Sequence, residues 1–447
     1  MSLPPVAEPI LMVLSIAFTE PSFQRFLVLT VGAILTSGPR TVLRVLATMG
    51  PLAPGDPTDY HRLFSRAPWS TWKLGKLIAA LILALVPADE WVVVPMDDTV
   101  LERKGKKVYG KGCHRDAKRS SQNHIVHVYG QKFVVLAVLV KFPFCRRPWA
   151  LPVLEALYRP EELNQAEGRR HKTPAQLAKG LMAQLMHWFP ERKFLFVGDG
   201  GFASHELARF AHRHRRRCAL VALFHGDAAL YEPPPPYRGK GRPRLKGAKL
   251  PSPAETVAAR RLRTTTVAWY GATERTVQIA SGRGHWYRAG QGLVPVQWVF
   301  VRDVTGTRND QYFYCTSPGL LTPEQIVEVY TMRWNIEVTF EEVRAHLGIE
   351  GLRHWCPRSV LRVAPCLFGL FSLVALIYHE HGKRHPVRVI QRPGYEKTEP
   401  TFADALATVR ELFWTETVFQ QPPFRRVWKK VPRRLRSFLL MHLCQAV

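Results

Sequence analysis

The stretch LTPEQIVEVYTMRWNIEVTFEEVRAHLG, residues 321–348, carries the features around which the rest of the chain can be arranged. We predict that it forms one helix. Thr322 suits the N-cap, Pro323 suits the first helical position, and Gln325 completes a capping box with Thr322. Gly348 stands where a left-handed residue would end the helix. Both limits of the helix are therefore marked by sequence signals.

One face of this helix collects polar residues. At about 100° per residue, they fall within a stripe roughly 80° wide. The members of this stripe are Tyr330, Arg333, Glu337, Glu341 and Arg344. A carboxylate flanked by guanidinium groups and a phenol suits a phosphate ester, because the carboxylate can hold a metal ion while the arginines bind phosphate oxygens. Ordinary i, i+4 ion pairs on a solvated helix would give the same pattern, so the helix alone leaves both interpretations open.

An adjoining apolar stripe would seat the same helix on a core. Its members are Val329, Ile336, Phe340, Val343 and Leu347.

The composition indicates a folded protein with a polyanionic partner. The chain has 447 residues, of which 46% are hydrophobic, which is enough for about three domains with sizeable cores. Its 63 Lys and Arg residues exceed its 35 Asp and Glu residues, and the formal net charge of +28 favours nucleic acid over a membrane surface. The 7 cysteines are scattered without a CxxC pair, which fits a reducing cytosol and argues against a zinc site.

Two further features bear on localisation. The amino terminus lacks a basic segment followed by a cleavable apolar core, so we expect a cytoplasmic protein. The longest apolar run, residues 363–378, is short for a membrane span and is interrupted by Pro365, Gly369 and Ser372. We predict a buried helix there and no membrane partner.

Residues 1–88 have helical periodicity with a basic, turn-rich part in the middle. This part contains Arg40, Arg44, His61, Arg62 and Arg66. It is compatible with a helix-turn-helix that places these residues on DNA, or with an ordinary helical bundle that has a basic exterior. The pattern does not choose between them.

Two short apolar runs end in carboxylates. WVVVPM, residues 91–96, has the β-branched character of a buried strand and leads into Asp97 and Asp98. KFLFVG, residues 193–198, leads into Asp199 and a glycine-rich turn. Each carboxylate could belong to a solvated turn when it is considered alone. Carboxylates from two strand ends and a later helix can, however, converge on a pair of divalent ions, as two-metal phosphodiester chemistry requires.

Glu337 is the candidate for the third carboxylate, because it lies in the centre of the polar stripe. Between the two strand ends, NHIVHVYG and QKFVVLAVLVKF predict two antiparallel strands that meet at Gly130 and Gln131.

Together, WVVVPMDDT, FVGDGG and YTMRWNIEVTFEEVR resemble the DDE transposases of bacterial insertion sequences, in particular the subgroup with a Tyr-x2-Arg-x3-Glu-x6-Lys signature. Tyr330, Arg333 and Glu337 match this signature in type and spacing. Arg344 departs from it, because the family usually has lysine there; the charge is kept, but a planar fork replaces a point donor. The resemblance places the first carboxylate immediately before the threonine, at Asp98, with Asp97 as the alternative register.

The resemblance implies an α/β fold: an RNase H-like core with a mixed five-stranded sheet and flanking helices, interrupted by an inserted β-rich domain, plus a helical N-terminal domain. We expect a helical DNA-binding domain over 1–88, the first part of the catalytic core over 89–230, and a basic linker with the β-rich insertion over 231–315. The second part of the core, with the Glu helix, is expected over 316–380, and a basic helical C-terminal region over 381–447.

The linker that precedes the β-rich strands is rich in proline, glycine and basic residues. Its Gly241-Arg242-Pro243 segment, followed by Arg244, resembles an AT-hook, a short arm that lays arginines in the minor groove. A flexible basic linker is the alternative. Either version would contact DNA.

The resemblance also implies an activity. We expect a DNA transposase that binds the ends of its insertion sequence, cleaves phosphodiester bonds by two-metal-ion hydrolysis and joins the 3′-OH ends to target DNA. Asp98, Asp199 and Glu337 would hold two Mg²⁺ ions, with Mn²⁺ able to substitute. The DNA contacts are assigned to Tyr330, Arg333, Arg344, Arg242 and Arg244.

The expected partners are double-stranded DNA, both transposon ends and target, and a second copy of the chain in the DNA complex. The expected setting is the bacterial cytoplasm, in association with the nucleoid. Two alternatives stay open: a two-metal DNA endonuclease without strand transfer, and a non-catalytic DNA-binding protein derived from a transposase.

Overall fold

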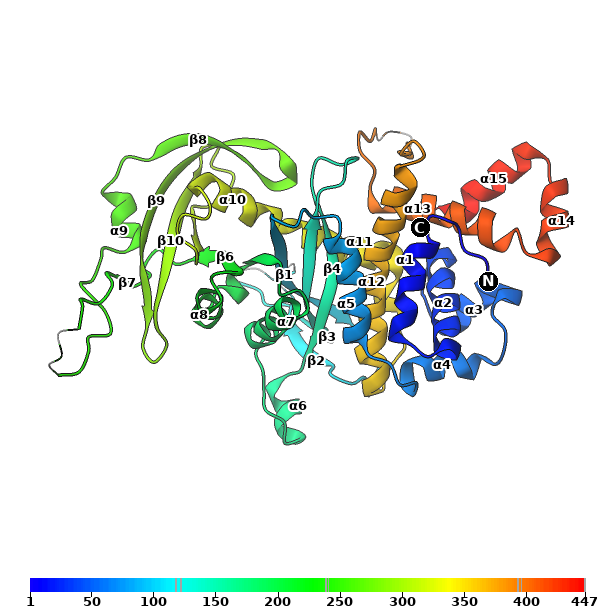
Figure 1. Cartoon of the computed structure of the whole chain (residues 1–447), viewed down its shortest axis with the longest axis horizontal. Coiled ribbons are helices and arrows are strands. Elements are labelled where there is room, and N and C mark those ends of the chain that lie inside the picture. Colours follow the sequence, from blue (N-terminus) through cyan, green and yellow to red (C-terminus); the bar gives the residue numbers. More distant parts are fainter. Residues whose placement is uncertain are drawn as a thin grey trace.

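The computed structural model describes residues 1–116, 119–120, 123–237, 239, 241–391, 394 and 396–445. The molecule is elongated, with a β-rich part at one end and a helical part at the other (Figure 1). One mixed sheet of 11 strands runs through the β-rich part and the centre. The helix pair α10 (Pro323–Met332) and α11 (Trp334–Leu347) links this sheet to the helical part.

The centre of the sheet is the mixed five-stranded arrangement that the sequence predicts. Its strands lie in the order β4, β3, β1, β5, β6; the pairs β4–β3 and β3–β1 are antiparallel, whereas β1–β5 and β5–β6 are parallel. The bounds are β1 Trp91–Glu102, β3 His127–Val140, β4 Trp149–Tyr158, β5 Lys193–Gly198 and β6 Cys218–Phe224. This is an RNase H-like core.

Helices cover both faces of this core. Leu195 and Val197 of β5 pack with residues of α10, whereas the alternate residues Phe194 and Phe196 belong to the main hydrophobic cluster, together with residues of α7 and α8. The helices on that side are α6 Glu161–Ala166, α7 Pro174–Trp188 and α8 His205–Arg213. Because both faces are buried, the central strands are apolar throughout rather than alternating.

The expected β-rich insertion is present, and its strands are continuous with the core sheet. β11 pairs antiparallel with β6, so the insertion extends the core sheet. This pairing satisfies the backbone groups of β6, which would otherwise be an exposed edge. The inserted elements are β7 Leu230–Tyr231, α9 Pro253–Ala258, β8 Arg263–Ala268, β9 Glu274–Arg288, β10 Gly292–Asp303 and β11 Gln311–Cys315.

The prediction of two strands that meet at Gly130 and Gln131 is wrong. β3 continues through both residues, and its amino-terminal part pairs with β2 (Gly112–Arg115). The glycine serves a close approach rather than a turn, because a Cβ atom at position 130 would lie 2.4 Å from the carbonyl oxygen of Leu101.

The helical part combines both ends of the chain. Helix α12 (Pro357–Gly382) lies at its centre and contacts β4, α5 and α13. The other helices are α1 Glu8–Met12, α2 Glu20–Leu35, α3 Val42–Met49, α4 Pro57–Ser65, α5 Thr71–Leu83, α13 Phe402–Phe413, α14 Pro422–Lys430 and α15 Arg433–Cys444. Among the described helices, α12 alone has the length and apolar composition of a membrane span, but 83% of its most apolar window is buried inside the protein. The predicted buried helix over 363–378 is therefore confirmed.

Several arginines are buried and serve as internal hydrogen-bond donors. Arg40, which the sequence placed in a possible DNA-binding part, instead donates to the carbonyl oxygens of Ala33, Gly38 and His346, and so ties α2 to the end of α11. Arg410 donates to the carbonyl oxygens of Ile34 and Thr36, which close the carboxyl end of α2. Helix carbonyls without an intrahelical partner need such donors.

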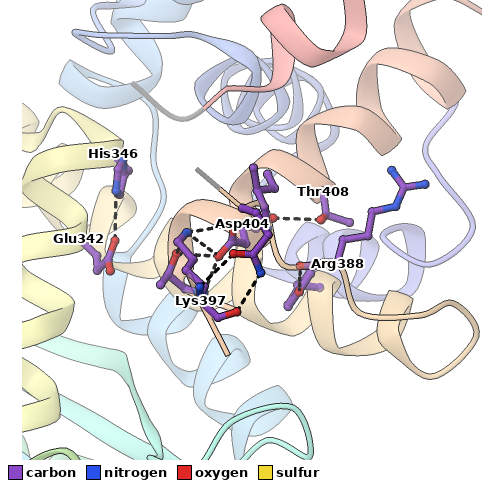
Figure 2. A network of polar contacts seen from close by, with 10 residues as sticks. Glu342, His346, Arg388, Lys397, Asp404 and Thr408 are labelled. Atoms are coloured by element: carbon purple, nitrogen blue, oxygen red, sulfur yellow. Dashed lines mark hydrogen bonds and ion pairs between the residues drawn. The ribbon is translucent and has the colours of Figure 1, made fainter. Parts of the chain in front are cut away.

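A buried ion pair fastens the segment before α13 (Figure 2). The Nζ atom of Lys397 lies 3.0 Å from Asp404 Oδ2, and the two side chains are 10% and 1% exposed. Asp404 also accepts from the backbone N–H groups of Thr401 and Ile390, at 2.8 and 3.1 Å. The carboxylate thus caps α13 and holds the preceding loop at the same time.

The predicted helix over 321–348 is present, with one irregularity. Thr322 and Gln325 form the capping box, and Gly348 ends the helix in the left-handed conformation at φ 61°. At Arg333 the helix tightens and is divided into α10 and α11, because Arg333 N and Ile336 N donate to carbonyl oxygens three residues back. The predicted apolar stripe is buried.

Candidate active site

Asp97 and Asp199 lie side by side where the parallel pairing of β1 with β5 ends. In the β1–β5 register, Pro95 pairs with Val197 and Met96 pairs with Gly198, so Asp97 and Asp199 come next on their strands. Residues paired across parallel strands share a face of the sheet, and these two carboxylates therefore face the same side. Asp199 Oδ1 also accepts from Gly201 N at 2.9 Å, which orders the glycine-rich turn.

Glu337 reaches the same place from the first turn of α11, and Arg333 links it to β1. The Nη1 atom of Arg333 donates to Asp97 Oδ2 at 2.6 Å, and its Nη2 atom donates to Glu337 Oε1 at 3.0 Å. The side chains of Arg333 and Asp97 are 9% and 13% exposed. One buried guanidinium thus binds two of the three carboxylates.

The carboxylates lie close enough to influence one another's charge. Burial raises the pKa of Asp97 to about 7; Arg333 opposes this shift, whereas the negative charges of Asp199 and Glu337 add to it. Burial by itself would lower the pKa of Arg333, but the neighbouring acidic groups, chiefly Asp97, hold that pKa above its ordinary value. Three carboxylates around one guanidinium give the cluster a net negative charge when all three are ionised.

Tyr330 packs beside this cluster but is buried. Its ring lies 4.2 Å from that of Phe313 on β11, centroid to centroid, and the guanidinium of Arg333 lies 5.7 Å from the tyrosine ring. Burial raises the pKa of its hydroxyl above the ordinary range. The structure therefore brings Tyr330, Arg333 and Glu337 together as the sequence predicts, although as a packed cluster rather than an exposed stripe.

Asp98, the predicted first carboxylate, does not lie beside Asp199 and Glu337; the structure places the alternative, Asp97, there. Adjacent residues of a strand point to opposite faces, so Asp98 faces away from Asp199 and Glu337. It forms an ion pair with Lys132 of the neighbouring strand at 3.0 Å. The buried His114 interacts electrostatically with both partners of this pair.

Arg344 is occupied within the protein. Its guanidinium donates to Thr99 Oγ1 and, at 3.3 Å, to the carbonyl oxygen of Val100 on β1. Its Nε atom donates to Glu350 at 3.1 Å. The predicted phosphate contact thus becomes, in this structure, a link between α11 and the end of β1.

Arg242 and Arg244 lie in an exposed loop between β7 and α9. Figure 1 shows this loop extending from the β-rich end of the molecule, on the far side of the sheet from the helical part. The structure does not bring these arginines to the acidic cluster, and their predicted role would be a separate contact.

A cavity of about 460 Å³ opens next to the break between α10 and α11. Three tryptophans, Trp91, Trp269 and Trp334, line it together with Arg146 and Arg147. In the described part of the chain, the buried indole N–H of Trp269 has no hydrogen-bond partner. Aromatic faces beside guanidinium groups suit a nucleotide, because the base can stack while the phosphate accepts hydrogen bonds.

The donor set of the cluster fits a divalent cation. Asp97, Asp199 and Glu337 offer only carboxylate oxygens, the ligands that Mg²⁺ and similar hard ions prefer. Among the described residues, no group of three or more acidic, histidine or cysteine side chains is already arranged to hold a metal. Arg333 binds both Asp97 and Glu337. A cation there would therefore have to replace some of the Arg333 contacts.

Comparison with known proteins gives the family. A protein family described as DDE superfamily endonuclease matches residues 14–276, more than half of the chain, a range that includes Asp97 and Asp199 but not Glu337. A solved structure, the cryo-EM structure of a piggyBac transposase synaptic complex with hairpin DNA, is similar at a TM-score of 0.42 and 10% identity, covering 98% of this chain and 81% of that one. No curated protein matches the sequence. On the family match, the chain belongs to the DDE superfamily of endonucleases.

Proposed function

We propose that this protein is a DNA transposase that cleaves DNA at the ends of its element and joins the 3′-OH ends to target DNA. The observation that carries the proposal is the convergence of Asp97, Asp199 and Glu337 around one buried arginine, in a chain that belongs to a family of endonucleases. In the proposed assignment, Asp97 takes the role that the sequence gave to Asp98.

The three carboxylates are proposed to hold Mg²⁺, as two ions, with Mn²⁺ able to substitute. When bound, such ions activate the attacking oxygen and stabilise the leaving oxygen of a phosphodiester. The convergence of three carboxylates on a single guanidinium supports a cation at this place. Arg333 would balance part of that charge before metal and DNA arrive.

Arg333 can donate one further hydrogen bond. In the described part of the chain, its buried Nε–H group has no hydrogen-bond partner, while both Nη atoms bind carboxylates. An unsatisfied buried donor is costly, so an oxygen atom that reaches it is stabilised. We propose that a phosphate oxygen of the DNA occupies this position.

A run of basic residues follows β1, the strand that carries Asp97. The segment that follows β1 carries exposed cations, namely Lys104, Lys106, Lys107, Arg115 and Arg119. β1 continues past Asp97 to Glu102, and we propose that these side chains bind the DNA backbone beyond the carboxylates. The net charge of +28 agrees with such a partner.

We further propose that the chain belongs to the subgroup with the Tyr-Arg-Glu-Lys signature, with Arg344 in the last position. The packing of Tyr330 and Arg333 against Glu337 supports this placement. The proposed assembly is a homodimer in the DNA complex, and the proposed setting is the bacterial cytoplasm.

The test is incubation of the purified protein with DNA of its element's end and Mg²⁺, with the products resolved by size and connectivity. A transposase releases a 3′-OH end and joins it to a second DNA. An endonuclease without strand transfer gives cut ends only, and a non-catalytic DNA-binding protein shifts the DNA without cutting it. Absence of both cutting and binding would contradict the proposal.

A further inference from the structure

A run of basic residues at the carboxyl end of α8 has no role in the site described above. Arg213, His214, Arg215 and Arg216 are consecutive, and all four are exposed. Together with Arg217 they line an open depression of about 410 Å³. We call these residues the α8 patch.

Arg217 differs from the rest of the α8 patch because its guanidinium is used inside the protein. It donates to the carbonyl oxygens of Met186 and Pro190, at 3.3 and 2.7 Å, and so closes the carboxyl end of α7. Within the described ranges, the guanidiniums of Arg213, Arg215 and Arg216 form no ion pair with an acidic side chain. Their charges are therefore available to a partner.

The α8 patch lies near the amino-terminal end of β5, whereas the carboxylates lie near its carboxyl end. Phe194, near the start of β5, donates its N–H to the carbonyl oxygen of Arg217 at 2.8 Å, whereas Asp199 follows the end of the same strand. The strand has 6 residues, Lys193–Gly198. At about 3.3 Å per residue, the steps from Phe194 to Asp199 separate the two positions by about 17 Å. One phosphate cannot contact both.

The helix dipole explains only part of this run of basic residues. Basic residues near the carboxyl end of a helix are stabilised by the helix dipole, but this effect is limited to the last turn. Consecutive exposed cations beyond that turn repel one another and favour a polyanion. Guanidinium groups suit phosphates, because their planar N–H forks match two phosphate oxygens.

We propose that Arg213, Arg215 and Arg216 bind the phosphate backbone of duplex DNA at a distance of about 17 Å along β5 from the catalytic carboxylates. The α8 patch thus holds DNA that is not being cut. This inference rests on the proposed function. Two sources present the same phosphates: the element's end DNA where it continues past the cleaved site, and a second duplex such as the target.

The experiment compares two triple variants that each remove three positive charges. Arg213→Ala/Arg215→Ala/Arg216→Ala removes the free guanidiniums of the α8 patch and leaves Arg217 in place. The control, on the exposed helix α14, is Arg425→Ala/Arg426→Ala/Lys429→Ala. Thermal unfolding of both variants checks whether they fold like the parent. Three probes are used: a short end duplex limited to the cleaved site, a long end duplex, and an unlinked duplex added to the protein already bound to the short one.

We expect the patch variant to bind and cut the short end duplex like the parent. With the long end duplex, a plot of log affinity against log salt should become less steep. Its slope should decrease in magnitude by about 2–3, because up to three phosphate contacts are lost. If the source is a second duplex, the loss appears instead in capture of the unlinked DNA. The α14 control should match the parent in each case.

The inference is overturned if the patch variant matches the parent with all three probes, or if the α14 control loses as much affinity as the patch variant. Failure of the parent protein itself to bind and cut end DNA is a different result, because it contradicts the proposed function rather than the role of the α8 patch.

Discussion

Arg333 is the residue on which the electrostatics of the candidate active site depend. It is buried and donates to Asp97 and Glu337, while Asp199 adds a third negative charge nearby. Without a cation at this position, the carboxylates would repel one another at a site where burial keeps water away from them. Arg333 therefore stabilises the metal-free protein as well as arranging the site.

Replacing Arg333 with Ala should lower the stability of the metal-free protein by about 3–5 kcal/mol, because it leaves buried carboxylates without their counter-charge. Added Mg²⁺ should recover part of the loss. The measurement is thermal unfolding with and without Mg²⁺, with the exposed Arg426→Ala on α14 as the control. An Arg333→Ala variant as stable as the parent in chelator would show that the ion pairs contribute little.

Glu155 offers a prediction on pH. Burial raises the pKa of this carboxyl to about 8 from 4.5, beside Cys366 and a small cavity. The folded state therefore holds the proton more tightly than the unfolded state, and the resulting stability is lost as the pH rises from about 4.5 to 8. Glu155→Gln should be more stable than the parent by about 1–3 kcal/mol at pH 9, with little difference at pH 4.5.

Thermal unfolding across that pH range measures the effect, and Glu191→Gln in an exposed turn is the control. A stability difference that is the same at pH 4.5 and pH 9 would contradict the assigned titration.

The choice between Asp97 and Asp98 shows what could not be predicted at this scale. Both faces of β1 are buried, so its apolar run lacks the alternation that would reveal which carboxylate faces the helix. Only the register against β5, which places Asp97 level with Asp199, decides the question. The end of β5, the glycine-rich turn after it and the place of Glu337 on its helix were predictable, because each is marked by a local pattern, whereas β1 continues past the predicted end at residue 96 to Glu102.

At the scale of elements, signals at helix ends proved more reliable than signals within strands. Thr322, Gln325 and Gly348 define the predicted helix, because capping satisfies backbone groups locally. Gly130 suggested a turn but lies inside β3, where it allows the close approach of β1. That distinction depends on a partner strand about thirty residues away, and no local pattern reports it.

Two glycine substitutions test this interpretation. Gly130→Ala should destabilise the protein by about 1–3 kcal/mol, because its Cβ would lie 2.4 Å from the carbonyl oxygen of Leu101. Gly180→Ala in α7 meets no atom within 4 Å and should stabilise the protein by up to about 1 kcal/mol, because alanine favours the helix. Chemical unfolding measures both. Equal effects of the two changes would contradict the close approach.

At the scale of the whole molecule, one continuous sheet and one central helix unite segments far apart in the sequence. The sequence predicted the class of each part but not the pairing of β11 with β6, which is a contact between distant strands.

The positive charge is divided between the surface and the interior of the protein. Some arginines are buried among carbonyls and carboxylates, so only part of the net charge of +28 can reach DNA. The buried arginines are Arg40, Arg103, Arg192, Arg333, Arg362 and Arg410.

The ion pair between Lys397 and Asp404 should hold the helical part together. Asp404→Ala removes the counter-charge of a buried lysine and the cap of α13, and should cost about 3–5 kcal/mol. The double variant Lys397→Met/Asp404→Ala should recover part of this loss, since no unpaired charge is left buried. Chemical unfolding of both variants measures the coupling. A double variant less stable than Asp404→Ala would contradict this account.

The central claim is that Asp97, Asp199 and Glu337 form the catalytic cluster, and single-turnover cleavage of element-end DNA in Mg²⁺ tests it most directly. Asp97→Asn, Asp199→Asn and Glu337→Gln should each lower the cleavage rate by about 10³-fold or more while DNA binding is kept. Asp98→Asn should keep most of the activity, because Asp98 pairs with Lys132 on the opposite face of β1. Loss of cleavage in Asp98→Asn, with near-normal cleavage in Asp97→Asn, would contradict the account.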